Sequence, residues 1–304
     1  MILIDYSQLF IAGALTFGSD FDKGRNAKEK QIDILRHTIL NTLLSDKKKY
    51  GNEYGEIVIA VDDKEYWRRD YFPYYKQHRK KNREESKTDW KAVFDIGTQL
   101  REEFKEVFPF RFVQAPGAEA DDIIATLVHY SQENETTRVG VFDDEPQPVL
   151  IKSSDGDFAQ LHRWANVRQW NPIQKKYVTK SGKYDLLEKI LTGDTGDGIP
   201  NVKSPDNFFT LEDAPRQGSI TAKIKQDARE QYDKNQTVDL GNPEWNRNFT
   251  RNRTLIDFDY IPHAIYTKIV EAYQSTVPVK DKGKIFNYFV KHRCKNLMGS
   301  IQDF

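Results

Sequence analysis

Acidic side chains recur directly after short apolar runs of this sequence, where several of them could bind a cation together. The acids in these positions are Asp5, Asp62, Asp155 and Asp157. Aspartate is also common in such turns because it caps helices and favours turn conformations. Capping explains any single one of these residues about as well as function does, but their recurrence favours function.

Two further segments add acids of the same kind. Glu119, Asp121 and Asp122 lie at the start of an expected helix, and three acids exceed what a helix N-terminus needs. Asp194 and Asp197 lie three residues apart in a glycine-rich turn, a spacing that is weak evidence by itself. Acids this close would raise each other's pKa values unless cations neutralised them.

The chemistry of the donor atoms indicates which metal would bind. The candidate metal ligands are Asp5, Asp62, Glu119, Asp121, Asp155, Asp157, Asp194 and Asp197. Oxygen ligands without His or Cys suit Mg²⁺ or Mn²⁺ rather than Zn²⁺. Two such ions can catalyse phosphodiester hydrolysis, because one activates water and the other stabilises the departing oxygen.

A basic and aromatic stretch follows Asp62. The segment 68–83 contains seven Lys or Arg residues and one acid, with aromatic residues interleaved. A solvated helix would explain the charges but not the rings. Cations that follow phosphates and rings that stack on bases explain both, so the stretch predicts a passage for single-stranded nucleic acid.

The elements that must position these residues are short strands alternating with helices. Strands are expected at 2–4, 57–61, 110–113 and 149–151, and helices at 28–44, 89–106 and 120–131. This alternation predicts an α/β fold with a mostly parallel central sheet flanked by helices. Ligands of such sheets bind at the carboxyl ends of the strands, so Asp5, Asp62 and Asp155 should meet at one edge.

The second part of the chain has a different character. Helices are expected at 186–191, 221–232, 263–274 and 285–298, and strand-like runs are scarce. We therefore predict an α/β catalytic domain at 1–183 and a smaller helical domain at 184–304.

Composition excludes several classes of protein. The chain has 304 residues, of which 38% are hydrophobic and 30% charged, and a single cysteine, Cys294. An intrachain disulfide is therefore impossible, which fits a reducing cytosol. We expect no membrane span, because no run of about 18 apolar residues is present, and no signal peptide. The net charge is zero, so only the distribution of charge indicates a nucleic-acid partner.

The order of these motifs resembles that of the 5′-nuclease superfamily, which includes flap endonucleases and the 5′–3′ exonuclease domains of bacterial DNA polymerases. After Asp5 and Asp62 come WRRDYFPYYKQHR, EADD, SSDGDF and GDTGDGIPNV, in that order. The likeness is greatest to the phage ribonuclease H members, and it covers nearly the whole chain. It implies a PIN-like core with a basic helical arch at 64–90.

The resemblance also implies roles for individual residues. All eight candidate acids match the family's metal site, Asp197 being an acid of the bacterial and phage branch. Lys76 and Arg79 match cations that contact the scissile phosphate, and together with Asp121 and Asp155 they are the residues assigned to catalysis. The expected nucleic-acid contacts are Arg68, Tyr75, Lys76, Arg79, Lys80, Lys81 and Arg83. One departure is the segment 199–205, which lacks the family's Gly-Ile-Gly hairpin. The acidic segment 143–146, read as a loop, has no assigned role.

We therefore expect a 5′–3′ nuclease that uses two Mg²⁺ ions, with Mn²⁺ as a substitute. Its substrates would be RNA–DNA and DNA–DNA duplexes with 5′ ends or flaps, and its task the removal of RNA primers in phage replication. A monomer in the host cytoplasm is expected, with a sliding clamp and a single-strand DNA-binding protein as candidate partners. The alternatives are a Mg²⁺-dependent phosphatase on a similar sheet and a non-catalytic binder of branched DNA.

Overall fold

The computed structural model describes residues 1–16, 21, 28–134, 136–139, 143–179, 182–211, 213 and 216–304. These residues form two compact units, and neither unit is a single continuous stretch of chain. The first unit contains 1–64, 86–178 and 263–304, and the second contains 65–85 and 179–262. No helix among the described residues is long and apolar enough to cross a membrane.

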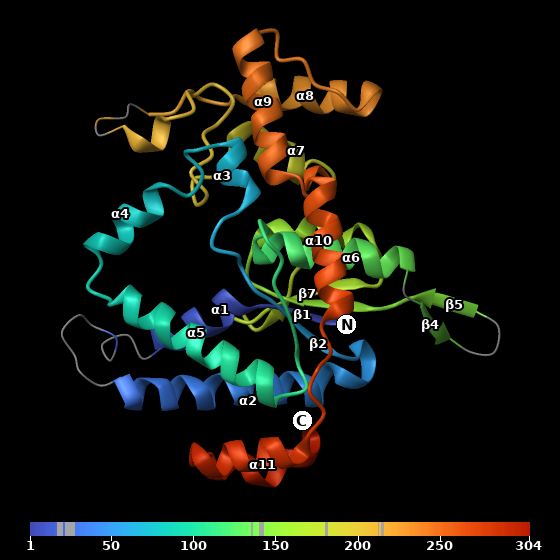
Figure 1. Cartoon of the computed structure of the whole chain (residues 1–304). Coiled ribbons are helices and arrows are strands. Elements are labelled where there is room, and N and C mark those ends of the chain that lie inside the picture. Colours follow the sequence, from blue (N-terminus) through green and yellow to red (C-terminus); the bar gives the residue numbers. More distant parts are fainter. Residues whose placement is uncertain are drawn as a thin grey trace. The chain divides into compact units, whose positions relative to one another are not determined.

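The first unit is built on a sheet of six strands that is mostly parallel, and the parallel arrangement is as the sequence predicted (Figure 1). In spatial order the strands are β3 (Arg111–Val113), β2 (Ile57–Ala60), β1 (Ile2–Asp5), β6 (Val149–Lys152), β7 (Val167–Asn171) and β8 (Lys176–Tyr177). The first five pair in parallel and β8 pairs antiparallel with β7. All four predicted strands are present. The sequence did not predict β7, because its residues alternate between buried and exposed positions instead of forming an apolar run.

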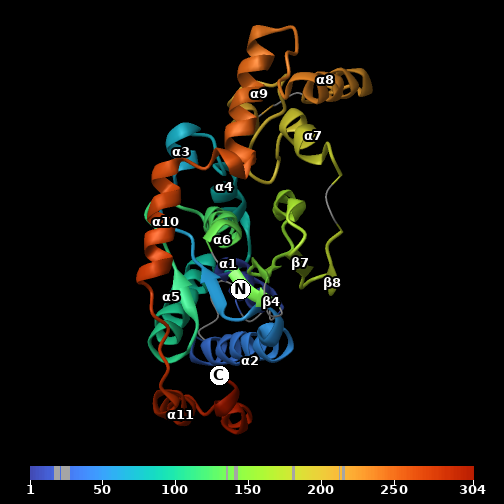
Figure 2. The same ribbon diagram turned by 90° about the vertical axis from the view of Figure 1, so that its right-hand side faces the viewer.

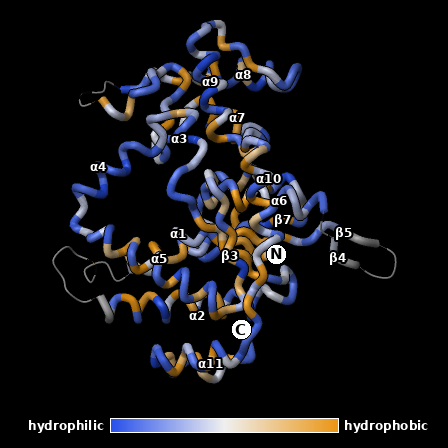
Figure 3. Tube along the Cα trace, in the orientation of Figure 1, coloured by the Kyte–Doolittle hydropathy of each residue, from blue (hydrophilic) through white to orange (hydrophobic). Residues whose placement is uncertain are grey.

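Helices cover both faces of this sheet (Figures 1 and 2). Helices α1 (Tyr6–Thr16), α2 (Lys28–Tyr54) and α5 (Trp90–Val107) share a hydrophobic core with one face, and α6 (Ala120–Asn134) packs against β1 and β2 from the other. Hydrophobic residues accordingly concentrate on the strands (Figure 3). Helix α2 continues beyond its predicted end at 44, because Tyr50 and Tyr54 are buried in the core despite their polar neighbours.

The last part of the chain packs on the sheet unit rather than with the other C-terminal helices. Helix α10 (His263–Ser275) lies beside α6 (Figures 1 and 2), and Arg111 of β3 donates a hydrogen bond to the carbonyl oxygen of Tyr273 at 2.9 Å. In α11 (Lys282–Lys291), Ile285 and Phe289 join the hydrophobic core. The compact units therefore differ from the predicted linear division between 183 and 184, which stays a prediction about sequence domains.

Two predicted elements need correction. The helix expected at 285–298 ends with α11, since Arg293 adopts a left-handed backbone with φ of 53°, and a 3₁₀ helix, η5 (Lys295–Asp303), follows. The acidic segment 143–146 is a strand, not a loop. It forms β5 (Asp143–Pro146), which pairs antiparallel with β4 (Thr136–Val139) in a two-stranded sheet of its own.

The second unit is helical. It contains α3 (Trp67–Tyr71), α4 (His78–Glu85), α7 (Asp185–Thr192), α8 (Ala222–Asn235) and α9 (Pro243–Ile256). The sequence predicted α7 and α8 but not α9, whose buried face is half polar. Asn248 donates to the carbonyl of Val202 at 2.9 Å, and Arg251 donates to that of Pro200 at 2.9 Å. Helix α9 thus fixes the segment that lacks the Gly-Ile-Gly hairpin.

Candidate active site

The turns after β1 and β6 are tied together by polar side chains. Asp5 ends β1, and its Oδ1 accepts a hydrogen bond from the amide of Gln8 at 3.1 Å, as a helix cap does. The Gln8 amide group donates to Ser154 Oγ at 2.6 Å and accepts from the Ser154 backbone N–H at 3.0 Å. Because β1 and β6 are neighbours, these two hydrogen bonds fix the backbone beside Asp5 and just before Asp155.

Asp62, just after β2, joins three segments of the first unit. Its Oδ2 accepts from the Ser7 hydroxyl at 2.7 Å, and its Oδ1 accepts from the Ala120 amide at the start of α6 at 2.8 Å. Each carboxylate oxygen has more than one acceptor position, so these bonds leave capacity for a cation. The contacts hold the carboxylate in one orientation.

The acids at the start of α6 divide into two kinds. Asp122 is fully buried, and its Oδ2 accepts from the Glu119 amide at 3.0 Å, which is a capping role. Glu119 is also buried, with 3% exposed, whereas Asp121 is partly exposed in the first turn. Neighbouring Asp63 has a structural task, because it accepts from the Gly117 amide at 2.9 Å.

Asp155 is both a cap and an exposed carboxylate. It precedes η2 (Gly156–Arg163), a 3₁₀ helix, and its Oδ1 accepts from the Asp157 amide at 2.8 Å. Gln169 of β7 donates to the backbone carbonyl of Asp155 at 2.6 Å and so fixes the turn. The Asp155 side chain is exposed and that of Asp157 is partly exposed.

We call six of the predicted ligands the strand-edge acids: Asp5, Asp62, Glu119, Asp121, Asp155 and Asp157. The structure places them after β1, β2 and β6 and at the start of α6, as predicted. In the part of the chain that the structure describes, no three Asp, Glu, His or Cys side chains are close enough to hold a metal ion as they stand. A donor set made only of oxygen nevertheless suits Mg²⁺, which keeps several of its waters and needs few direct ligands.

Asp194 and Asp197 lie in a tight glycine turn of the second unit. Asp194 and Ile199 exchange two backbone hydrogen bonds of 2.8 Å. Gly193 has φ of 72°, and a Cβ there would come within 2.3 Å of the Ile199 carbonyl oxygen, so only glycine fits. Asp194 forms an ion pair with Lys189 at 2.7 Å, a partner that the sequence pattern did not predict.

Asp197 is surrounded by residues of the basic stretch. Its Oδ1 lies 2.6 Å from Arg79 Nη2, and its Oδ2 accepts from the Tyr75 hydroxyl at 2.8 Å and lies 3.6 Å from Lys76 Nζ. Burial acts to raise the pKa of Asp197, but the charges of Lys76 and Arg79 and the Tyr75 hydroxyl outweigh it and lower this pKa. Asp197 is therefore an ionised counter-ion in this structure.

The predicted nucleic-acid contacts divide by burial. Arg68 and Tyr75 are each only 3% exposed, and Arg68 Nε donates to the Leu255 carbonyl at 2.9 Å. Burial of both side chains in the interior of the unit argues against their direct contact with nucleic acid, which stays a prediction. Lys80 and Lys81 are exposed on α4, which is hydrophilic along its length (Figure 3), and Arg83 is partly exposed.

The aromatic rings of the stretch also need correction. Tyr66 packs edge-on against Tyr75 at a centroid distance of 5.9 Å, and Phe72 packs against Tyr74 at 5.6 Å. These rings therefore build a hydrophobic cluster rather than a stacking platform, while Tyr71 is 47% exposed. The sequence pattern is compatible with a hydrophobic cluster and with a stacking platform, since it does not show which side of the segment faces the protein.

Sequence reasoning also missed the residues that hold the acids in place. Ser7 and Gln8 follow Asp5 directly, and Ser154 precedes Asp155. Polar residues beside a candidate ligand after a strand are a weak signal, and only the hydrogen bonds give them a role.

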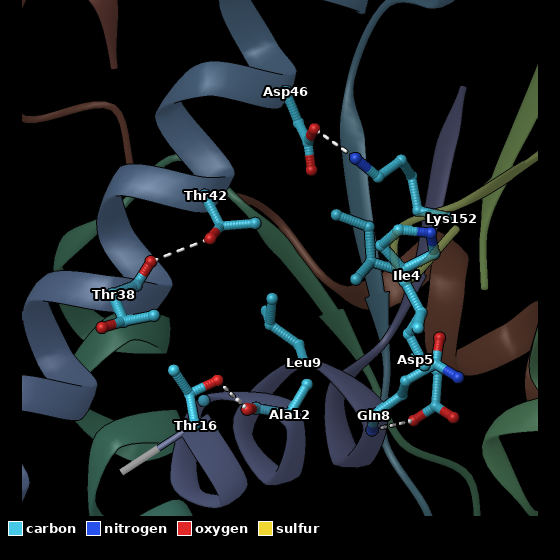
Figure 4. A pocket seen from close by; sticks show the side chains of 13 residues that line it. Ile4, Asp5, Gln8, Leu9, Ala12, Thr16, Thr38, Thr42, Asp46 and Lys152 are labelled. Atoms are coloured by element: carbon cyan, nitrogen blue, oxygen red, sulfur yellow. Dashed lines mark hydrogen bonds and ion pairs between the residues drawn. The ribbon is translucent and has the colours of Figure 1, made fainter. Parts of the chain in front are cut away.

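A pocket of the first unit adjoins one of the strand-edge acids, Asp5 (Figure 4). Its volume is about 220 Å³, and it is lined by residues of β1, α1, α2 and β6. Asp5 lies at one side of the pocket. At another side, Lys152 points toward Asp46 and forms an ion pair with it, and both side chains are more than 90% buried. Burial raises the pKa of the Asp46 carboxyl.

This ion pair predicts a specific effect on stability. Lys152→Met should lower the free energy of unfolding by about 3–5 kcal/mol, because it leaves a buried carboxylate without its partner. The double variant Asp46→Leu/Lys152→Met should recover most of that loss. In the exposed Lys91–Asp95 pair, Lys91→Met should leave the free energy of unfolding almost unchanged, because water screens that pair. Urea unfolding would measure all three, and equal costs for Lys152→Met and Lys91→Met would contradict the prediction.

The parallel sheet with acids at its carboxyl edge and the cationic helical segment that follows its second strand in the sequence are those of a nuclease of the 5′–3′ type, as comparison with known proteins shows. Residues 2–190 match the family of the 5′–3′ exonuclease N-terminal resolvase-like domain, and residues 180–304 match the C-terminal domain of T4 RNase H. The chain belongs to the 5′–3′ exonuclease family.

Individual relatives agree with this assignment. The chain is 38% identical over 310 residues to ribonuclease H of Enterobacteria phage T4, covering 99% of this chain and 95% of that protein. A phage T5 protein co-crystallised with metal ions has a similar fold, with 17% identity, a TM-score of 0.57, and coverage of 90% of this chain and 97% of that one. A phage T5 flap endonuclease in complex with DNA and metal ions is 18% identical to this chain, with a TM-score of 0.55. The match covers 90% of this chain and 99% of that one.

Proposed function

We propose that this protein is a Mg²⁺-dependent 5′–3′ nuclease with ribonuclease H and flap endonuclease activity. It hydrolyses phosphodiester bonds in RNA–DNA and DNA–DNA duplexes from 5′ ends or flaps, and it removes RNA primers during phage DNA replication. The observation that carries this proposal is the set of strand-edge acids held at the carboxyl ends of neighbouring strands. The name of the T4 relative supports the choice of RNA–DNA hybrids, and the T5 complex supports DNA flaps.

The strand-edge acids would hold two Mg²⁺ ions, for which Mn²⁺ could substitute. Such ions, when bound, activate water and stabilise the leaving oxygen. The contribution of this chain is orientation. The bonds from Ser7 and Ala120 hold Asp62, and the bonds between Gln8 and Ser154 hold the turns of Asp5 and Asp155. Acids held in this way lose less freedom when a cation binds.

The cations of the second unit would bind the substrate backbone. We assign Lys76 and Arg79 to contacts with a substrate phosphate, and Lys80, Lys81 and Arg83 to electrostatic binding along the strand. The side chains of Arg79, Lys80 and Lys81 are accessible, which supports the assignment. We further propose that the protein acts as a monomer in the host cytoplasm, with a sliding clamp and a single-strand DNA-binding protein as partners.

The direct test is cleavage of two labelled substrates, a 5′-flap DNA duplex and an RNA–DNA hybrid. Both should be cleaved to short oligonucleotides in Mg²⁺ or Mn²⁺ and left intact in EDTA, because the acids offer no nitrogen or sulfur ligand. Cleavage that survives chelation, or that requires Zn²⁺, would contradict the proposal.

The same assay separates the alternatives. A phosphatase would turn over a small phosphomonoester and leave both duplexes intact. A binder of branched DNA would shift the flap duplex in Mg²⁺ without cleaving it.

A further inference from the structure

Asp197 connects the glycine turn of the second unit to the basic stretch through its backbone as well as its carboxylate. The Lys76 amide donates to the Asp197 carbonyl at 2.8 Å, and Arg79 Nε donates to the Gly196 carbonyl at 3.0 Å. Lys76 itself has φ of 55°, a left-handed conformation that non-glycine residues rarely adopt. Such outliers persist where the surroundings enforce them, and they gather at functional sites.

The glycine turn and the basic stretch also pack closely at Gly198. Gly198 has φ of 71°, and a Cβ there would lie 3.0 Å from His78 Nδ1 and 3.3 Å from the Tyr74 carbonyl oxygen. The glycine turn and the start of α4 therefore form one packed junction, and Asp197 supplies its charge.

Both oxygens of Asp197 are engaged by donors, and two of the donors are cations. Arg79 holds Oδ1, while Tyr75 and Lys76 hold Oδ2. A metal ion at this carboxylate would displace or repel these cations. Asp62 differs, because the Ser7 hydroxyl and the Ala120 amide that donate to its carboxylate are neutral.

We propose that Asp197 is a positioning residue that presents Lys76 and Arg79 to substrate phosphates, and that it is not a metal ligand. The junction contains two cations and one carboxylate, so it keeps a net positive charge while the carboxylate fixes both side chains. The Arg79 side chain is 43% exposed and that of Lys76 is 11% exposed, so Arg79 presents the more accessible charge of the two. This inference rests on the proposed contact of Lys76 and Arg79 with substrate.

The test compares Asp197→Asn with Asp233→Asn. Asp233 is a matched control, because it also pairs with a lysine and a tyrosine, Lys183 at 2.8 Å and Tyr184 at 2.6 Å, and it lies on α8. Single-turnover cleavage of the flap duplex is measured against Mg²⁺ concentration. Asp197→Asn should lower the maximal rate about 10- to 100-fold, the scale for misplaced catalytic groups. The Mg²⁺ concentration for half-maximal rate should stay unchanged, and Asp233→Asn should behave as wild type.

A second readout is flap binding in Ca²⁺ at several salt concentrations. Release of the cations from Asp197 should steepen the salt dependence of binding by about one counterion. This readout does not require cleavage. If the wild-type protein bound the flap but cut nothing, the proposed function would fail, while a steeper slope for Asp197→Asn would still support the positioning role.

Two further variants guard against a folding defect. Asp197→Glu keeps the charge and should retain more of the rate than Asp197→Asn. In an Arg79→Gln background, Asp197→Asn should cost less than in the wild type, because the part of its effect that passes through Arg79 is already lost. Strictly additive losses, or a half-maximal Mg²⁺ concentration raised tenfold with the rate recovered at high Mg²⁺, would overturn the proposal in favour of a metal ligand.

Discussion

Asp121→Asn and Asp155→Asn should each reduce single-turnover cleavage at least about 100-fold while the protein stays folded. The loss corresponds to about 3 kcal/mol of transition-state stabilisation, within the contribution expected of a metal ion that is displaced or misplaced. Flap affinity in Ca²⁺ should persist or increase, because the substrate phosphates meet one negative charge fewer. These outcomes separate a metal site from a row of capping residues.

The local structure makes Asn a suitable replacement at Asp155. Its Oδ1 accepts from the Asp157 amide, and asparagine caps helices about as well as aspartate does. The cap should therefore survive the change. Removal of one charge also relieves repulsion among the strand-edge acids, so the metal-free melting temperature should not fall.

Asp89→Asn is a matched control in the same unit. Asp89 is the N-cap of α5 and accepts from the Ala92 amide at 3.0 Å, so the substitution makes the same chemical change in the same kind of position. It should alter neither the rate nor the affinity. If either variant melted at a lower temperature and cut at the wild-type rate, the residue that it replaces would have a structural role and not a metal-binding one.

Lys76→Ala should reduce the cleavage rate far more than it weakens binding of the duplex. A positive charge on a phosphate oxygen matters most in the transition state, where negative charge develops, and loss of one such group costs about 10²- to 10³-fold. Arg79→Ala should behave similarly. Single-turnover rates in Mg²⁺ and flap affinities in Ca²⁺ measure the two effects separately.

Lys80→Ala and Lys81→Ala are the controls for this experiment. Both residues are exposed on α4, so these changes should lower affinity and reduce the salt dependence of binding by about one counterion each, with little effect on the saturated rate. A Lys76→Ala protein that cleaved at the wild-type rate would show that the assigned role is wrong.

The sequence alone determined the parallel sheet and the edge where the acids collect. Apolar runs fix the positions of β1, β2, β3 and β6, because each strand is buried. The helices between them force parallel pairing, which brings the strand ends to one side. Asp5, Asp62 and Asp155 could therefore be assigned to one edge without coordinates.

The tertiary structure decided which polar residues face inward. The sequence pattern did not predict helix α9. Asn248 and Arg251 are buried and donate hydrogen bonds to backbone carbonyls, and buried polar residues interrupt the apolar period by which a helix is predicted. For the same reason, Arg68 and Tyr75 could not be told apart from the exposed Lys80 and Lys81.

Only the structure shows what the charged residues contact. The packing of α10 and α11 on the sheet unit depends on long-range contacts that a sequence pattern does not record. The partners of Asp197 lie more than a hundred residues away along the chain, in Tyr75, Lys76 and Arg79. The sequence of a glycine turn with an aspartate is the same whether the carboxylate faces a metal ion or a basic side chain. Its role therefore depends on which side chains the folded chain places beside it.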